Sequence, residues 1–221
     1  MSKKIGLFWL KEDFRVIKNY ALAEATKNHD HVVVFYLYKK NLFEDQFAQK
    51  WWVSRSLEEF KKKLDEFNIS LEIIKVKSYQ VFFEELLKKD NFSIYWNKTY
   101  EPKYLDFDEL LSKKLISKNI EFKICKGNTL NEYYEIKKND STPFKVFTPF
   151  WRTAEKFYLD KVPSKSRSIL KKKKKITFFK NIFNEKKILP ENKWYTKFEK
   201  CWQPSEEKAL LELKNFIKSR I

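Results

Sequence analysis

The chain has 221 residues, of which 43% are hydrophobic and 18% aromatic, enough to bury the core of one large domain or of one ordinary domain with an appendage. Its longest apolar run, residues 31–38, has the length of a strand and not of a membrane span, and no export signal of the usual pattern is present, which favours a cytoplasmic protein without a membrane partner. The cysteines, Cys125 and Cys201, form no CxxC motif, so a metal or redox pair is not expected.

The formal net charge of +17 predicts a polyanionic partner. A second interpretation stays open, because basic residues that are nearly all lysine, together with two glycines, are typical of codons rich in A and T. Much of the lysine excess would then lie on solvated faces without a ligand. Charge alone therefore does not establish DNA binding.

Segments of strand and helix character alternate through the first 125 residues. The expected strands are 5–10, 31–38, 71–76, 93–96 and 120–125, and the expected helices are 20–28, 49–67, 79–89 and 105–118. Because strands separated by helices cannot be joined by hairpins, the sheet should be parallel with helices on both faces. Right-handed crossovers then favour an α/β fold with a doubly wound, five-stranded, Rossmann-like sheet over residues 1–130.

A ligand of such a sheet binds beyond the carboxyl ends of the strands, where the strand order reverses. The loops in question follow Trp9, Tyr38 and Trp96. The only two glycines, Gly6 and Gly127, form neither a GxGxxG fingerprint nor a P-loop. A glycine-rich phosphate cradle is therefore excluded.

The pattern changes after about residue 130. We expect a helix and an interdomain linker over residues 131–204, with the helix at 148–159, capped by Thr148 and with Pro149 at its first position. Residues 205–221 read as a closing amphipathic helix with Ser205 as its N-cap. Its apolar face needs a partner, so in the chain alone we expect exposure of five side chains: Trp202, Leu210, Leu213, Phe216 and Ile217.

Two short polar clusters have simple structural explanations. Asn19, directly before an expected helix, reads as an N-cap, and Asp13 and Arg15 either fix the first loop or face a ligand. The sequence His29-Asp30-His31 has no third metal ligand nearby, so a metal site is not expected there.

Four stretches carry recognisable patterns in chain order. Trp9, Asp13, Arg15, Asn19, Ala21 and Leu22 fall in the first, followed by Asn97–Pro102 (NKTYEP), Phe144–Phe150 (FKVFTPF) and Trp202–Ala209 (WQPSEEKA). These stretches resemble motifs of the DNA photolyase and cryptochrome family, approximately WxRxDLR with DNxAL, NxxY/IEP, YxVFTPF and WxPGExxA. The chain departs from the first pattern at Lys11, Phe14 and Lys18, where the family carries arginine, leucine and aspartate.

The resemblance implies the amino-terminal α/β domain of that family, which holds an antenna chromophore, a folate or a deazaflavin. It points to Trp9, Lys11, Asn97 and Glu101 as cofactor-binding residues, with Glu101 as the best single candidate. A carboxylate at this sheet edge can accept hydrogen bonds from a heterocycle, although a solvated loop acid is an equal alternative. Glu12 departs from the deazaflavin pattern and residues 103–104 from the folate pattern, so the pigment stays unassigned.

In the family, an all-helical domain follows, binds FAD and receives the flipped-out pyrimidine dimer of DNA. We expect no FAD site and no catalytic residue in this chain, which would be inactive alone. On the helix near residue 150, Arg152 and Lys156 are candidates for phosphate contacts, or are simply solvated charges. The lysine run 171–175 is either a phosphate-binding segment or a mobile connector.

The function implied by the resemblance is light-dependent repair of pyrimidine dimers in DNA, with this chain supplying the antenna-type domain. Two alternatives stay open. One is a cryptochrome-like blue-light photoreceptor, and the other is a truncated, stand-alone α/β protein that binds a nucleotide or pigment.

Overall fold

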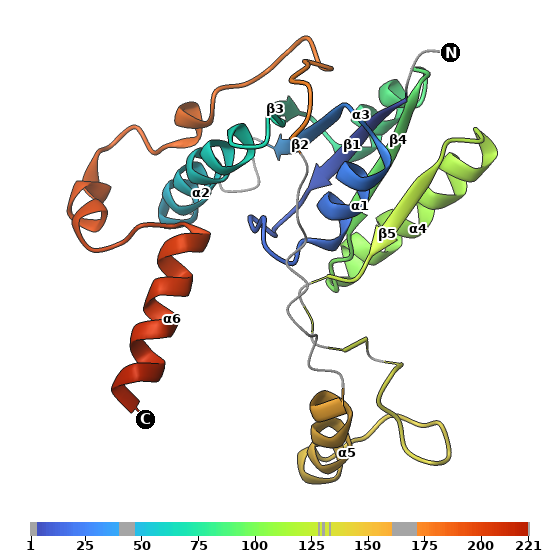
Figure 1. The fold of residues 1–221 in the computed structure, drawn as a ribbon. Coiled ribbons are helices and arrows are strands. Elements are labelled where there is room, and N and C mark those ends of the chain that lie inside the picture. The colour runs from blue at the N-terminus through green and yellow to red at the C-terminus, as the bar shows by residue number, and fades with distance from the viewer. Residues whose placement is uncertain are drawn as a thin grey trace.

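The computed structural model of the chain describes residues 4–39, 47–127, 129, 131–132, 134–160 and 172–220. Its centre is a five-stranded sheet of β1 (Ile5–Leu10), β2 (Val32–Lys39), β3 (Ser70–Val76), β4 (Phe92–Asn97) and β5 (Phe122–Cys125). All neighbouring strands are parallel, in the order β3-β2-β1-β4-β5 (Figure 1). The order reverses between β1 and β4, which confirms the predicted doubly wound α/β fold.

Two helices cover each face of the sheet. They are α1 (Tyr20–Asn28) and α2 (Phe47–Asp65) on one face, and α3 (Tyr79–Leu86) and α4 (Pro102–Ser117) on the other. Alternate side chains of a strand point to opposite faces, so in β1 Phe8 and Leu10 join the core under α1 and α2, while Leu7 and Trp9 join the core under α3 and α4. Burial on both faces explains why the central strands are continuous apolar runs.

Three element ends differ from the sequence prediction, each for a local backbone reason. Helix α2 ends at Asp65 and α3 at Leu86, and each is followed by an asparagine in the left-handed region, Asn68 and Asn91. Strand β5 begins at Phe122, because the Ile120 N–H donates to the Leu115 carbonyl and closes the end of α4.

The two short polar clusters are structural. The Asn19 side chain accepts from the Leu22 N–H and caps α1, as predicted. The His29 ring bonds the Lys4 carbonyl oxygen through Nδ1, at 3.0 Å, and the Tyr95 hydroxyl through Nε2, at 2.9 Å. Since both ring nitrogens are used in the fold, His29 has no nitrogen left for a metal. Among the described residues, no group of three His, Cys, Asp or Glu side chains is arranged to hold a metal ion.

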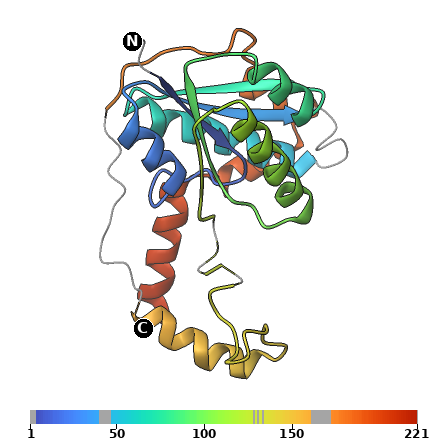
Figure 2. The same ribbon diagram turned by 90° about the vertical axis from the view of Figure 1, so that its right-hand side faces the viewer.

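After β5 the chain leaves the sheet and forms α5 (Phe147–Asp160), which stands apart from the sandwich (Figures 1 and 2). The helix begins before Thr148, so the predicted cap is wrong: the first helical bond runs from the Phe150 N–H to the Val146 carbonyl. Pro149 then lies in the first turn, where a missing N–H has no intrahelical partner to lose. Among its described side chains only Ala154 is buried.

Residues 172–183 return along the outer edge of β3. Backbone bonds join Lys173 to Phe67 and Phe183 to Ile73, and the buried Glu72 carboxylate accepts from the N–H groups of Phe178 and Phe179. The described part of the lysine run is therefore held against the sheet and is not a structureless connector. Lys171 lies outside the described residues.

Two 3-10 helices follow, η2 (Glu185–Ile188) and η3 (Trp194–Lys200), and lead to α6 (Glu206–Arg220). As predicted, Ser205 caps α6, its hydroxyl accepting from the Lys208 N–H. The Glu206 carboxylate accepts from the Val16 and Ile17 N–H groups at 2.8 and 3.0 Å, so the first turn of α6 is bound to the loop after β1. The rest of the helix projects from the domain (Figure 1).

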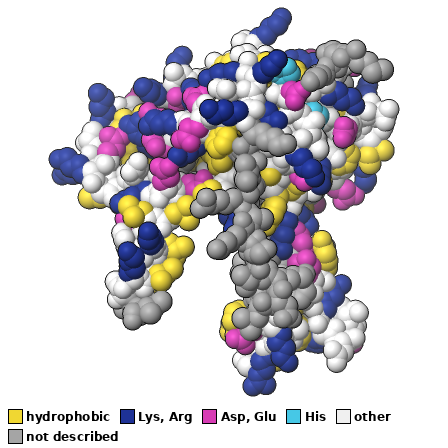
Figure 3. All heavy atoms as spheres, in the orientation of Figure 1, with side chains coloured by type: hydrophobic (Ala, Val, Ile, Leu, Met, Phe, Trp, Pro, Cys, Tyr) yellow, Lys and Arg dark blue, Asp and Glu magenta, His cyan; other side chains and the backbone are white. Residues whose placement is uncertain are grey.

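The apolar side chains of α6 are exposed, as the sequence predicts. They are Leu210, Leu213, Phe216 and Ile217, and Trp202 before the helix is exposed as well. Hydrophobic side chains are visible along α6 in Figure 3, where Lys and Arg are interspersed with Asp and Glu over the sandwich. None of the described helices combines the length and the apolar character needed to cross a lipid bilayer.

Candidate functional site

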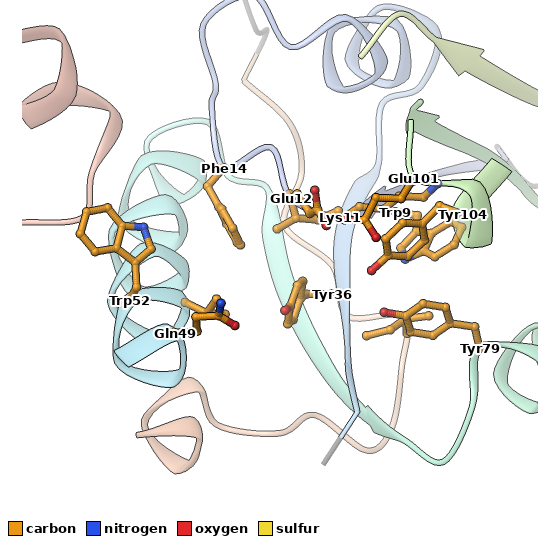
Figure 4. A pocket seen from close by; sticks show the side chains of 13 residues that line it. Trp9, Lys11, Glu12, Phe14, Tyr36, Gln49, Trp52, Tyr79, Glu101 and Tyr104 are labelled. Carbon is orange, nitrogen blue, oxygen red and sulfur yellow. The ribbon is translucent and has the colours of Figure 1, made fainter. Parts of the chain in front are cut away.

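A cavity of about 510 Å³ lies at the carboxyl edge of the sheet. Its lining comes from the end of β1 and the loop that follows, from β2, and from helices α2, α3 and α4. Figure 4 shows the aromatic rings of Trp9, Tyr79 and Tyr104 gathered on one side of the cavity. Phe14 and Trp52 lie on the other side. We call this cavity the β1 pocket.

The aromatic side of the β1 pocket is held by the core. Trp9 is only 2% exposed and packs edge-on against Tyr79 and Phe83, with ring centroids 5.7 and 4.8 Å away. Tyr79 is stacked on Tyr104 with an interplanar angle of 21°. This wall is therefore rigid, and it offers flat apolar surface to a planar ligand.

Lys11, one of the predicted cofactor residues, is part of a buried ion pair. Its ammonium nitrogen lies 2.6 and 2.8 Å from the two carboxylate oxygens of Asp108 and 3.3 Å from the Thr99 hydroxyl. The two charged side chains are 4% and 7% exposed. Burial lowers the pKa of Lys11 and raises that of Asp108, and in each the partner's charge opposes the effect. The same ammonium lies 4.5 Å from the centre of the Trp9 ring.

Glu101, the best candidate from the sequence, lines the β1 pocket at the start of α4. It is exposed, and its side chain does not cap the helix. The pKa of Tyr104 is raised, first by burial and then by the negative charges of Glu12 and Glu101. The predicted position of Glu101 at a ligand-facing edge agrees with the geometry, and a direct cofactor contact stays a proposal.

Asn97 does not line the β1 pocket. It is buried at the end of β4, where its side chain accepts from the Ala21 N–H at 3.0 Å and donates to the Asn19 side chain at 2.9 Å. These bonds tie β4 to the start of α1, so the placement of Asn97 supports a structural link better than a cofactor contact. It borders only a space of about 20 Å³ between β1 and β4.

The point of strand reversal is therefore filled by protein, and the ligand-sized space is displaced toward β2. A second cavity of about 330 Å³ adjoins the β1 pocket, with Trp52 in the lining of both. In this second cavity Arg15 binds Asp13 through two bonds of 2.6 and 2.8 Å, the loop-fixing arrangement that was one of the two expectations.

Arg152 and Lys156 lie elsewhere. Both are exposed on α5, and neither borders the β1 pocket. The predicted cofactor residues and the predicted phosphate contacts thus belong to two separate regions of the molecule (Figure 1).

Asp108 was missed by the sequence analysis. A signal for it exists, because Tyr104, Asp108, Leu111 and Leu115 recur at helical spacing and form one buried stripe of α4. An acid within an apolar stripe is expected to have a buried cationic partner.

Comparison with known proteins identifies relatives in one family. The family model described as DNA photolyase matches residues 6–167. The deoxyribodipyrimidine photo-lyase of Agrobacterium fabrum is 25% identical over 211 residues, 96% of this chain and 44% of that protein. Cryptochrome-2 of Arabidopsis thaliana is 27% identical over 157 residues, 69% of this chain and 25% of that protein.

Solved structures agree on the fold. A bacterial class III photolyase from Agrobacterium tumefaciens superposes with a TM-score of 0.82 at 23% identity, covering 99% of this chain and 45% of that one. The photolyase from Sulfolobus tokodaii with two FAD molecules gives 0.59 at 19% identity, covering 83% and 40%. The chain thus spans less than half the length of the relatives it matches.

Proposed function

Because the chain belongs to the DNA photolyase family, a photolyase-related protein, we propose that it supplies the antenna-type α/β domain for light-dependent repair of pyrimidine dimers in DNA. The observation that carries this proposal is the β1 pocket, with a rigid aromatic wall and a carboxylate at its rim. Its volume of about 510 Å³ lies in the range of about 300–1,000 Å³ that is usual for small-molecule sites.

In this proposal the pocket holds a light-absorbing heterocycle, a folate or a deazaflavin or a flavin. The Sulfolobus tokodaii photolyase, described with two FAD molecules and a novel light-harvesting cofactor, supports a pigment in this family. The residues present fit a planar ring: Trp9 and Tyr104 offer aromatic surface, and Glu101 offers an acceptor for ring N–H groups. When bound, the pigment would supply absorption of light, and the chain's part is to bind and orient it.

Binding of a pigment is tested by titrating the purified chain with riboflavin, 5-deazariboflavin and a reduced folate. We expect at least one to bind, and Glu101→Gln to weaken that binding about tenfold, since a hydrogen bond to a charged acceptor is worth about 1.5–3 kcal/mol. Isothermal titration or fluorescence quenching measures the affinity.

The matched control is Glu109→Gln, an exposed carboxylate on the same helix that pairs with Lys113 outside the pocket. It should leave the affinity unchanged. Failure of all three probes to bind, or equal effects of the two variants, would count against a pigment site at Glu101.

We further propose DNA as the partner of the complete protein and α5 as one of its phosphate contacts. The exposure of Arg152 and Lys156 on a helix that stands apart from the sheet supports this assignment. The catalytic flavin, FAD, is proposed to bind in a helical domain of the complete protein, and we assign no catalytic residue to this chain.

Charge reversal tests the contact with DNA. The double variant Arg152→Glu/Lys156→Glu is expected to lower affinity for duplex DNA about tenfold and the slope of log K against log salt by about 2, roughly 0.9 per phosphate contact. Fluorescence anisotropy over a salt series gives both quantities. Lys88→Glu/Lys113→Glu on α3 and α4 produces the same change in net charge, and an equal loss there would show that only total charge matters.

A cryptochrome-like photoreceptor remains the second candidate. It is supported by the match to Arabidopsis cryptochrome-2, which covers 69% of the chain against 96% for the Agrobacterium photolyase. The wider coverage favours the photolyase-related function.

A further inference from the structure

The charges at the floor of the β1 pocket carry an inference about which ligands it accepts, and this inference rests on the proposed function. An ammonium group has three N–H donors and no acceptor. In Lys11 the three printed acceptors are the two carboxylate oxygens of Asp108 and the Thr99 hydroxyl, at 2.6, 2.8 and 3.3 Å. All three donors are therefore used within the protein.

Asp108 also cancels the charge of Lys11. The carboxylate and the ammonium are in contact and almost fully buried, so seen from the pocket they act as a neutral pair. Lys11 lines the pocket, but its contribution to a ligand is the shape of its side chain and its support of the Trp9 ring. It offers neither a hydrogen bond nor a net positive charge.

The remaining features of the pocket disfavour a phosphate. Glu12 lines it, and its negative charge helps to raise the pKa values of Tyr36 and Tyr104 on opposite sides. Backbone N–H groups at a helix start would attract an anion, but α4 begins with Glu101 and with Pro102, which has no N–H. The first N–H groups of α3 are capped by the Ser78 hydroxyl.

One further cation lies near the pocket. Lys39 Nζ is 4.8 Å from the centre of the Tyr79 ring, and Lys39 is not among the side chains that line the cavity. Arg15 is engaged by Asp13 in the adjoining cavity. No described arginine lines the β1 pocket, and Lys11 is the one described lysine that does.

We propose that Asp108 is a specificity-determining positioning residue, which neutralises Lys11 so that the β1 pocket accepts an uncharged planar heterocycle and rejects the same ring bearing a phosphate. Without Asp108, Lys11 would present a positive charge and free N–H donors to the ligand. The selectivity for neutral ligands would then weaken or reverse.

Riboflavin and FMN test this, because they share one ring system and differ by a phosphate. We expect the purified chain to bind riboflavin at least tenfold more tightly than FMN. Asp108→Asn keeps the shape of the side chain but not its charge, and should shift the ratio of the two dissociation constants about tenfold toward FMN, or about 1.4 kcal/mol. Fluorescence titration of each probe gives the ratio, which a merely structural defect would not move.

Asp13→Asn is the matched control, since it removes a carboxylate from the neighbouring loop whose partner is Arg15. It should leave the ratio at the wild-type value. If Asp108→Asn does not fold, the double variant Lys11→Met/Asp108→Leu decides, because replacing a buried pair by apolar side chains is often tolerated. That variant should keep the preference for riboflavin, and its loss would contradict a neutral pair.

The outcomes separate the two proposals. A wild-type chain that binds both probes equally, or a folded Asp108→Asn variant with an unchanged ratio, overturns the role of Asp108 and leaves the pigment site standing. Absence of binding by riboflavin, FMN, deazariboflavin and folate overturns the proposed function, and the role of Asp108 falls with it.

Discussion

Replacing Gly127 by alanine should destabilise the protein by about 3 kcal/mol or more, since overpacking against backbone cannot be relieved by a change of rotamer. A Cβ atom at this position would lie 2.0 Å from the carbonyl oxygen of Lys98 and 3.0 Å from the Tyr100 ring. The chain after β5 would have to move away from β4. The loss corresponds to roughly 6–12 °C in the thermal midpoint for a chain of this size.

Movement of this loop would also break the bonds that hold it. Glu132 accepts from Lys98 at 3.0 Å and from the Tyr100 hydroxyl at 2.8 Å. Urea unfolding measures the effect, with Lys126→Ala as the control, because it adds no atom to the tight contact. A Gly127→Ala protein within about 0.5 kcal/mol of the wild type would show that the close approach is not required.

The second large effect is expected at Glu72, whose buried carboxylate binds the returning segment. Its oxygens lie 2.9 Å from the Phe178 nitrogen and 2.8 Å from the Phe179 nitrogen. Glu72→Leu would leave two amide groups without their acceptor, at a cost of about 2–4 kcal/mol in the free energy of unfolding. The Phe179 ring would also loosen from Phe35, with which it is in contact at 5.3 Å.

Local release should be visible besides the global loss. We expect faster hydrogen exchange at the amides of Phe178 and Phe179 and faster cleavage by a lysine-specific protease within residues 172–183. Glu84→Gln, an exposed carboxylate on α3, is the control and should leave both rates unchanged. Wild-type exchange rates in Glu72→Leu would contradict the anchoring role.

Much of the sheet could be predicted because its strands are buried on both faces. Continuous apolar runs such as 31–38 are stable only in that environment, and the helices between them require parallel pairing. The ends of elements were less predictable, since they depend on single backbone bonds such as that from Ile120 to Leu115. Neither atom of that bond is specified by side-chain type.

The candidate site was only partly predictable. Position after a strand correctly placed Trp9 and Glu101 at the pocket, but could not show that Asn97 turns toward α1. The partner of Lys11 is 97 residues away in the sequence, and only the packing of α4 brings Asp108 beneath it. The path of residues 172–183 along β3 likewise depends on a buried Glu72 that looks like an ordinary strand residue in the sequence.

The attachment of α6 through its first turn gives the helix the mechanics of a lever. Fifteen residues at 1.5 Å each make an arm of about 22 Å, so a tilt of about 10° at Ser205 displaces its far end by about 4 Å. The pivot is the Glu206 carboxylate on the amides of Val16 and Ile17, in the loop that also borders the β1 pocket. A small shift of that loop would therefore be amplified at the tip of α6, which makes the helix a mechanical reporter of the pocket.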